Sequence, residues 1–155
     1  MLSKSTRIKQ RLGSLLAGGC LLLSLGCGGD DEPYRKPTIP VTGVIQIDGQ
    51  TPQSPVKVVA HPIDGMDQEH PSVSHCMTDD GGKFAFSTYV SGDGIPQGEY
   101  RLTFQAGQLN LVSRSYSGDL LKGRYSDPEK SEFTVTVADT DSIELGTIEL
   151  STKGQ

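Results

Sequence analysis

Apolar and polar residues alternate along most of the chain from Val41 onward, in short runs separated by Gly, Pro, Asp and Ser. A period of two places successive side chains on opposite faces, which is typical of strands with one buried face. The last run shifts its apolar phase by one at Gly146, so we expect a β-bulge there. The pattern predicts seven strands, at residues 41–47, 56–60, 72–78, 84–86, 100–104, 133–137 and 143–150.

These short strands, with turn residues between them and hardly any helical periodicity, predict an all-β fold: an antiparallel β-sandwich at residues 41–151. One or two helical turns are expected near residues 117–122, where Leu120 and Leu121 could cover one end of the sandwich. Residues 106–130 are the longest irregular stretch. Such a stretch is either a functional loop or a plain crossover between the sheets.

The first 26 residues have a different organisation. Basic residues between Lys4 and Arg11 precede an apolar run at residues 12–26, and the chain turns polar directly after Cys27. This run has the length of a signal-peptide segment and is shorter than the roughly 20 residues that a membrane-spanning helix needs. We expect residues 1–26 to be a helical export signal that is removed. An ordinary secretory signal and an uncleaved anchor are the alternatives.

The end of the apolar run reads Ser24-Leu25-Gly26-Cys27. It resembles the lipobox of bacterial lipoproteins, in which a small residue precedes a cysteine that is acylated and becomes the mature N-terminus. Ser24 stands where the motif prefers Leu. Cys20 is a competing candidate, but the apolar run continues beyond it. The resemblance implies lipidation of Cys27 by palmitate-type chains, which would hold the protein on a membrane because each buried methylene contributes about 0.8 kcal/mol.

The same resemblance implies a location in the bacterial cell envelope, with the domain facing the periplasm or the exterior. Gly28 follows the cysteine, where an aspartate is associated with retention in the inner membrane, so the outer membrane is favoured. Residues 27–40, rich in Gly, Asp and Pro, are expected to form a flexible tether. With Cys27 acylated, Cys76 is the one thiol of the domain, and no internal disulfide is available to it.

The two parts of the chain differ in net charge. The whole sequence has a net charge of −5, but its first eleven residues hold four of the 14 Lys and Arg and no acid. Beyond residue 26, 10 basic residues face 19 acidic ones, a net charge of −9. Such a domain would repel phosphates, which excludes a basic nucleic-acid binder.

Four segments in the body of the chain carry a family resemblance. They read V-T-G-V-I-Q-I-D-G at 41–49, T-D-D-G-G-K-F at 78–84, G-D-G-I-P-Q-G-E-Y at 92–100 and Y-S-D-P at 125–128. In this order they resemble carboxypeptidase regulatory-like (transthyretin-like) domains, as found in small lipoproteins of planctomycete bacteria. The resemblance implies a seven-stranded Ig-like or transthyretin-like sandwich. It implies no activity, because the free-standing lipoproteins have none assigned.

The second segment is a turn motif made by Asp79, Gly82 and Phe84. Gly82 is expected at a position that needs a positive φ, and Phe84 is expected to enter the core. Residues 64–74 depart from the family, because they carry more charge and histidine than these domains usually have there.

The residues with metal-binding chemistry are His61, His75 and Cys76, together with His70. Imidazole and thiolate suit zinc or copper, but the spacing matches no compact ligand motif. His75 and Cys76 are neighbours in an expected strand and would point to opposite faces. We therefore expect no metal site and no cofactor. The loop acids that could offer oxygens to calcium form no dedicated calcium loop; they are Asp79, Asp80, Asp93, Asp127 and Glu129.

No catalytic motif of the G-x-S-x-G or H-E-x-x-H type is present, so we expect no catalytic residues and no enzyme activity. The sequence predicts a non-catalytic, membrane-tethered β-sandwich that acts as a binding or structural module, with an envelope protein as its partner. The alternative is a ligand-binding module for carbohydrate or calcium, which would use residues 89–98 and 106–130. Its stacking residues would be Tyr89, Tyr116 and Tyr125.

Overall fold

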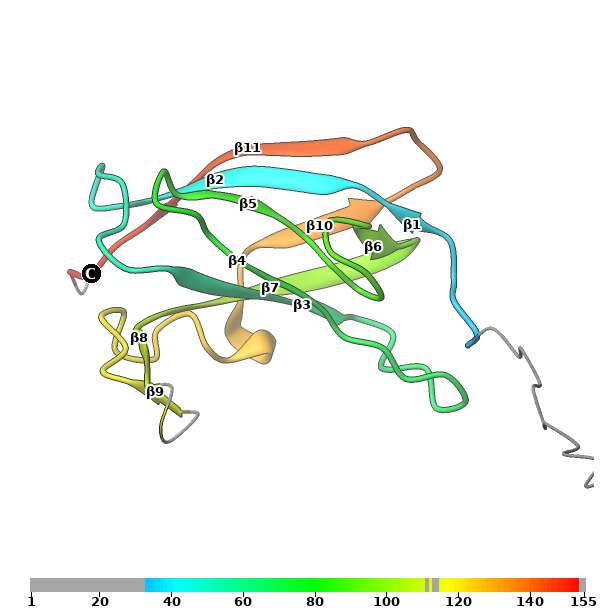
Figure 1. The fold of residues 1–155 in the computed structure, drawn as a ribbon, viewed down its shortest axis with the longest axis horizontal. Helices are drawn as coiled ribbons and strands as arrows, with labels where there is room; N and C mark the ends of the chain where they lie inside the picture. Colours follow the sequence, from blue (N-terminus) through cyan, green and yellow to red (C-terminus); the bar gives the residue numbers. More distant parts are fainter. Residues whose placement is uncertain (1–32, 111, 113–114, 154–155) are drawn as a thin grey trace, which may run out of the picture. The chain divides into compact units, whose positions relative to one another are not determined.

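Two sheets face each other across an apolar core in the computed structural model, which describes residues 33–110, 112 and 115–153 (Figure 1). The larger sheet has the strand order β10 (Thr134–Val137), β7 (Gly98–Ala106), β3 (Val56–Pro62) and β4 (Ser74–Met77). The smaller sheet has the order β11 (Ile143–Leu150), β2 (Val41–Ile47) and β5 (Lys83–Ala85). The architecture is all-β, as the alternation of apolar residues predicts. The expected signal at residues 1–26 and Cys27 lie outside the described residues.

The core is built from the inward-facing residues of both sheets. In β3, Val56, Val58 and Ala60 are buried, and the residues between them are partly exposed. Phe86 and Phe104 are the largest of the fully buried side chains. Each buried polar side chain in the described part of the chain has a hydrogen-bond partner, so the core carries no unpaired polar atom there.

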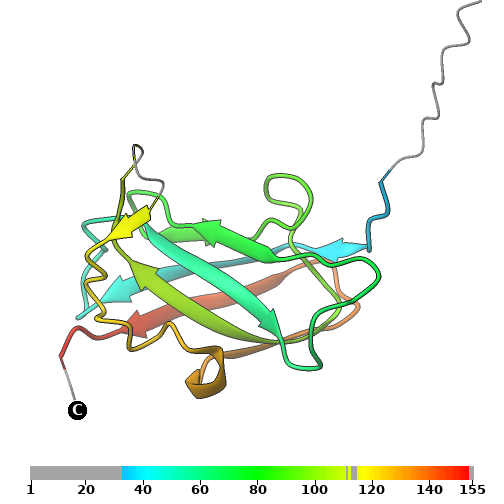
Figure 2. The same cartoon turned by 90° about the horizontal axis from the view of Figure 1, so that it is seen from below.

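The two long sides of the sandwich differ. On one side, β4 meets the residues after β5, because His75 and Ser87 exchange two backbone hydrogen bonds of 3.0 Å. On the other side lie β10 and β11, and no ladder joins these two strands in the part of the chain that the structure describes. We call the side with β10 and β11 the open side. Figure 2 shows the molecule turned by 90° from the view of Figure 1.

One strand pair departs from the antiparallel expectation. β11 runs parallel to β2, with Ile143 opposite Val41 and Leu150 opposite Ile47. The two strands start at the same end, where the N–H of Ile143 donates to the carbonyl of Pro40 at 2.9 Å. The expected bulge in β11 is confirmed: Gly146 has a φ of 68°, and the register shifts between Glu144 and Thr147.

The predicted helical turn at residues 117–122 is wrong. Gly118 and Lys122 have positive φ values of 68° and 52°, which no helix accommodates, and residues 120–122 form a turn. The described helical element is instead the short 3₁₀ helix η1 (Pro128–Lys130). Leu121 is buried in the core, whereas Leu120 is 49% exposed, so one of the two leucines covers the end of the sandwich.

Two short strand pairs were not expected. β1 (Thr38–Ile39) pairs with β6 (Ile95–Pro96), and β8 (Gln108–Asn110) pairs with β9 (Ser115–Ser117). Of these strands, β1 lies within the segment predicted as tether, residues 27–40. Residues 33–40 are in fact bound to the sandwich, and the side chain of Ile39 is buried in its core.

Candidate functional site

The turn motif at residues 79–84 is a structural device. The carboxylate of Asp79 accepts hydrogen bonds of 2.8 Å from the backbone N–H groups of Gly81 and Lys83. Gly82 has a φ of 77°, and a Cβ at this position would lie 2.5 Å from the carbonyl oxygen of Ile45. Phe84 is buried, with its ring edge against Phe86. The motif therefore has a structural role: it holds β5 against β2.

The three metal candidates do not come together. His61 lies on β3 and is half-buried, and its Nε2 is 2.9 Å from the Thr103 hydroxyl. His75 is exposed on β4, whereas its neighbour Cys76 is buried, as the alternation of a strand requires. Burial raises the pKa of the Cys76 thiol to about 12, which keeps it protonated and unreactive. The described residues contain no group of three His, Cys, Asp or Glu side chains that could hold a metal ion.

Two loop aspartates, Asp93 and Asp119, use their carboxylates to bind backbone N–H groups. The Asp93 carboxylate accepts the N–H groups of Thr88, Tyr89 and Val90 at 2.7 to 3.1 Å. Burial acts to raise the pKa of Asp93, but these hydrogen bonds outweigh it and the pKa is lowered. Asp119 accepts three backbone N–H groups in the same way, from Ala106, Leu121 and Gly123. Asp93 and Asp119 shape their loops, and this role does not favour calcium.

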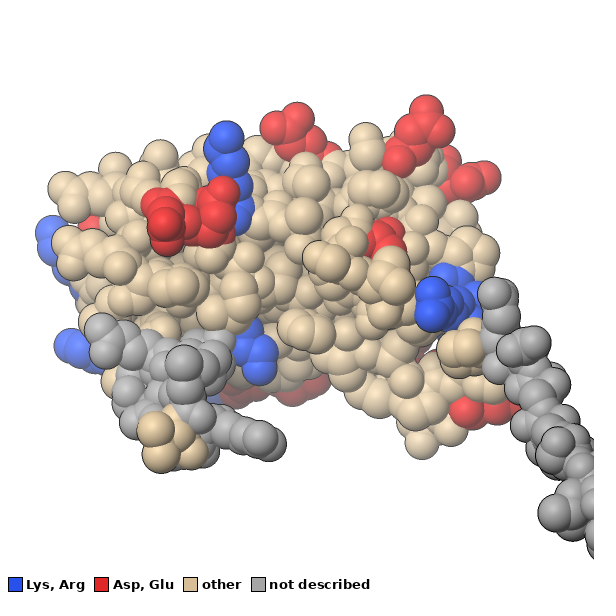
Figure 3. Space-filling model, in the orientation of Figure 1, with Lys and Arg blue, Asp and Glu red and all other residues tan. Residues whose placement is uncertain are grey.

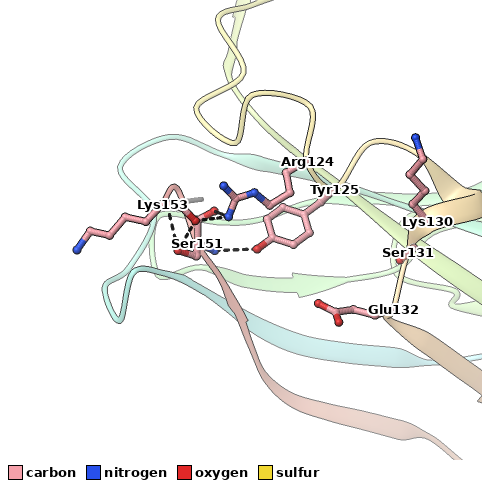
Figure 4. Close-up of a pocket in the computed structure, with 7 residues that line it drawn as sticks. All are labelled: Arg124, Tyr125, Lys130, Ser131, Glu132, Ser151 and Lys153. Carbon is pink, nitrogen blue, oxygen red and sulfur yellow. Dashed lines mark hydrogen bonds between the residues drawn. The ribbon is translucent and has the colours of Figure 1, made fainter. Parts of the chain in front are cut away.

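A groove on the open side brings together polar side chains that are distant in the sequence. Its volume is about 630 Å³. It lies between the segment that approaches β10 and the end of β11, as the close-up in Figure 4 shows. The residues that line it are Arg124, Tyr125, Lys130, Ser131, Glu132, Ser151 and Lys153.

One wall of the groove is fixed by hydrogen bonds to the end of the chain. The Arg124 guanidinium donates through Nη1 to the carbonyls of Ser151 and Lys153. The backbone N–H of Ser151 donates to the Tyr125 hydroxyl at 3.1 Å. Since an arginine has five N–H donors, the guanidinium keeps donors beyond those that these two bonds use.

The opposite wall comes from the segment before β10. The Ser131 hydroxyl donates to the carbonyl of Leu102 on β7, which fixes this segment to the edge of the larger sheet. Glu132 is exposed, and Figure 4 shows its carboxylate directed toward Tyr125. The groove therefore has an acidic group on one wall and a guanidinium on the other.

The Tyr125 ring contacts two aromatic side chains of the domain. It packs edge to face against Phe104 and Phe133, with centroid distances of 6.4 and 5.9 Å. The Arg124 guanidinium carbon lies 6.0 Å from the ring centroid. Tyr89 is also engaged, because its hydroxyl accepts the backbone N–H of Lys36 at 3.2 Å.

The sequence alone does not predict this groove. Its residues come from 124–125, 130–132 and 151–153, and none of these segments carries a motif for binding. Tyr125 falls within the Y-S-D-P segment, but that segment reads as a turn. The groove forms only because the fold brings these three segments together at the ends of the two sheets.

No protein-family model, curated protein or solved structure matches the chain. Among the residues that the structure describes, no helix is long and apolar enough to cross a membrane.

Proposed function

We propose that this protein is a non-catalytic lipoprotein of the bacterial cell envelope, anchored through acyl chains on Cys27, whose β-sandwich binds an extended segment of an envelope protein. The family resemblance to carboxypeptidase regulatory-like domains is part of this proposal, as is a transthyretin-like or Ig-like topology. The seven strands of the two main sheets support that topology. The outer membrane is the favoured location.

The open side of the sandwich is the observation that carries the binding role. Alternate residues of an edge strand direct their backbone N–H and C=O groups away from the sheet, where another chain can pair with them. Just before β10, the carbonyl of Phe133 accepts the N–H of Leu102 on β7, so the backbone groups of Phe133 face β7. Because this direction alternates along a strand, the backbone groups of Thr134 and Thr136 in β10 face away from β7. The groove lies beside this edge and offers both donors and an acceptor, a combination that suits a peptide.

The alternative, a carbohydrate or calcium module, has less support. Three tyrosines were expected to stack on sugar. The Tyr89 hydroxyl accepts a backbone N–H, and the hydroxyl and ring of Tyr125 make contacts within the domain. The side chain of Tyr116 lies outside the described part of the structure. Asp79 and Asp93 use their carboxylates to hold backbone N–H groups.

Site-specific photo-crosslinking in intact cells tests the binding role. A photo-reactive amino acid at Thr136, which is exposed on β10, should give a discrete adduct with one envelope protein. Glu132→Lys reverses a charge in the groove and should remove the adduct. Asp80→Lys makes the same charge change at an exposed turn outside the groove and should leave it intact. No adduct at Thr136, or an adduct equally strong in both variants, would overturn the proposal.

A further inference from the structure

The N-terminal segment at residues 34–36 is fastened to two loops at one end of the sandwich. The Tyr34 ring stacks on the His70 ring, with centroids 3.9 Å apart and planes inclined by 20°. The Lys36 ammonium pairs with the Asp67 carboxylate at 2.6 Å, and the Lys36 N–H donates to the Tyr89 hydroxyl. We call these contacts the clasp. Figure 1 shows the segment and the loop between β3 and β4 at the same end of the molecule.

The Lys36–Asp67 pair is the shortest polar contact of the clasp. The Lys36 ammonium, with the backbone N–H groups of His70 and Glu69, holds the pKa of the Asp67 carboxyl well below its usual range. The same contact raises the pKa of Lys36. Both groups are charged at neutral pH, and the backbone N–H bonds orient the carboxylate toward the lysine.

The clasp shortens the reach of the chain between a lipid anchor and the domain. Without it, the chain would be fixed to the sandwich from Thr38, where β1 begins, and the 11 residue steps from Cys27 to Thr38 could extend to about 40 Å. With the chain fastened from Tyr34, the seven steps from Cys27 to Tyr34 reach at most about 25 Å. A lipid anchor at Cys27 would then hold this end of the sandwich close to the bilayer surface.

This end exposes large apolar side chains. Tyr34, Ile63, Met66 and Val90 are 55%, 41%, 43% and 51% exposed. They come from the clasped segment and from the two loops that it contacts, through His70, Asp67 and Tyr89.

Charge does not account for an attraction of this end to a membrane. Lys and Arg atoms gather beside the start of the described chain in Figure 3, and the segment contains Arg35 and Lys36. The neighbouring loop carries Asp64, Asp67 and Glu69, which offset them. An apolar contact with the acyl boundary is therefore the interaction that these side chains support.

We infer that the clasp end of the sandwich, with Tyr34, Ile63, Met66 and Val90 at its surface, rests on the lipid bilayer and orients the domain with its opposite end outward. The inference rests on the proposed lipid anchor at Cys27. Anchoring gives these side chains a high effective concentration at the membrane, so a small apolar area is sufficient for contact. Because charge is offset, the contact should be similar on zwitterionic and anionic lipid.

Fluorescence quenching on the full, lipidated protein tests this orientation. Met66→Cys and Gln53→Cys place an environment-sensitive label at the clasp end and on the exposed loop between β2 and β3 at the opposite end. The native Cys76 is buried and should not react. In phosphatidylcholine vesicles that contain doxyl-labelled lipid, the label at residue 66 should be quenched several-fold more than the label at residue 53. Equal quenching of the two labels on anchored protein would overturn the inference.

A second variant tests the role of the clasp while the lipid anchor stays intact. Asp67→Asn with Tyr34→Ala should bring the quenching at residue 66 down to the level at residue 53 while the protein still sediments with the vesicles. Unchanged quenching at residue 66 would show that the clasp does not orient the domain. If unaltered protein from cells carries no lipid and does not sediment with vesicles, the proposed anchor fails instead, and this outcome is distinct from the other two.

Discussion

At the scale of single residues, Gly94 allows β1 of the N-terminal segment to pack closely against the sandwich. Its φ is 97°, and a Cβ there would lie 1.9 Å from the carbonyl oxygen of Ile39 on β1. We predict that Gly94→Ala lowers the free energy of unfolding by on the order of 3 kcal/mol or more, because the side chain meets backbone that cannot move away.

Gly92→Ala is the matched control for this variant. Gly92 also has a positive φ, of 75°, but no atom lies within 4 Å of the position that its Cβ would take. Its cost should be limited to the backbone strain of about 1–2 kcal/mol. Denaturant unfolding of both variants measures the difference, and equal losses would contradict the close approach of β1 to Gly94.

His61 gives a pH dependence at the same scale. Burial lowers its pKa below the usual 6.5, so between the lowered pKa and about 6.5 the unfolded chain binds a proton that the folded chain does not. Stability should therefore fall as the pH is lowered through this window. The lowered pKa values of Asp48, Asp67, Asp93 and Asp127 act only at lower pH, near and below about 4.

We predict that His61→Gln flattens the dependence of the unfolding free energy on pH in the range just below about 6.5. Gln keeps a side chain that can bond to Thr103. His75→Gln removes an exposed imidazole from the adjacent strand and serves as the control. A slope that is unchanged in His61→Gln, measured by urea unfolding across this range, would contradict the burial of a neutral imidazole.

At the scale of elements, the segment after β9 is packed into the sandwich through one leucine. Leu121 is 1% exposed, and Asp119 accepts three backbone N–H groups around it. Leu121→Ala should cost roughly 2–5 kcal/mol because it leaves a cavity at the end of the core. Leu120→Ala, at the exposed neighbour, should stay within about 0.5 kcal/mol of the parent. Thermal and denaturant unfolding distinguish the two, and a similar loss in both would refute this packing.

Several of the main strands could be predicted from the sequence because they bury alternate residues, as β2, β3 and β10 do. β1 and β6 span two residues each, which is too short for a period to be visible. The parallel pairing of β11 with β2 depends on where the chain returns after β10, and local alternation carries no information about strand direction. The burial of Leu121 rather than Leu120 was equally hidden, since it depends on a turn set by Asp119.

The candidate site was less predictable than the fold. The groove joins Arg124 to the end of the chain through backbone carbonyls, and such contacts have no signature in residue type. The clasp also has no signature in residue type: Tyr34 meets His70, and Lys36 meets Asp67, across more than 30 residues of sequence, in the segment that leads into β1. The unusual charge and histidine content of residues 64–74 was visible in the sequence, and the structure shows Asp67 and His70 of this segment in the clasp.

At the scale of the whole molecule, the two proposals describe one arrangement. The clasp end would rest on the bilayer, and the open side between β10 and β11 would remain available to an envelope partner. Beyond residue 26 the chain has 19 acidic and 10 basic residues. Anionic lipid repels such a negatively charged domain, so electrostatic attraction does not pull its whole surface onto the bilayer. All of this depends on the acylation of Cys27.

Intact-mass and tandem mass spectrometry of the protein from the membrane fraction of its own host tests that claim most directly. We predict a mature chain that begins at Cys27 and carries acyl chains on that residue. We also predict that Cys27→Ser leaves the chain unacylated and unprocessed at this position. An unmodified Cys27, or a mature chain that begins elsewhere, would contradict the account.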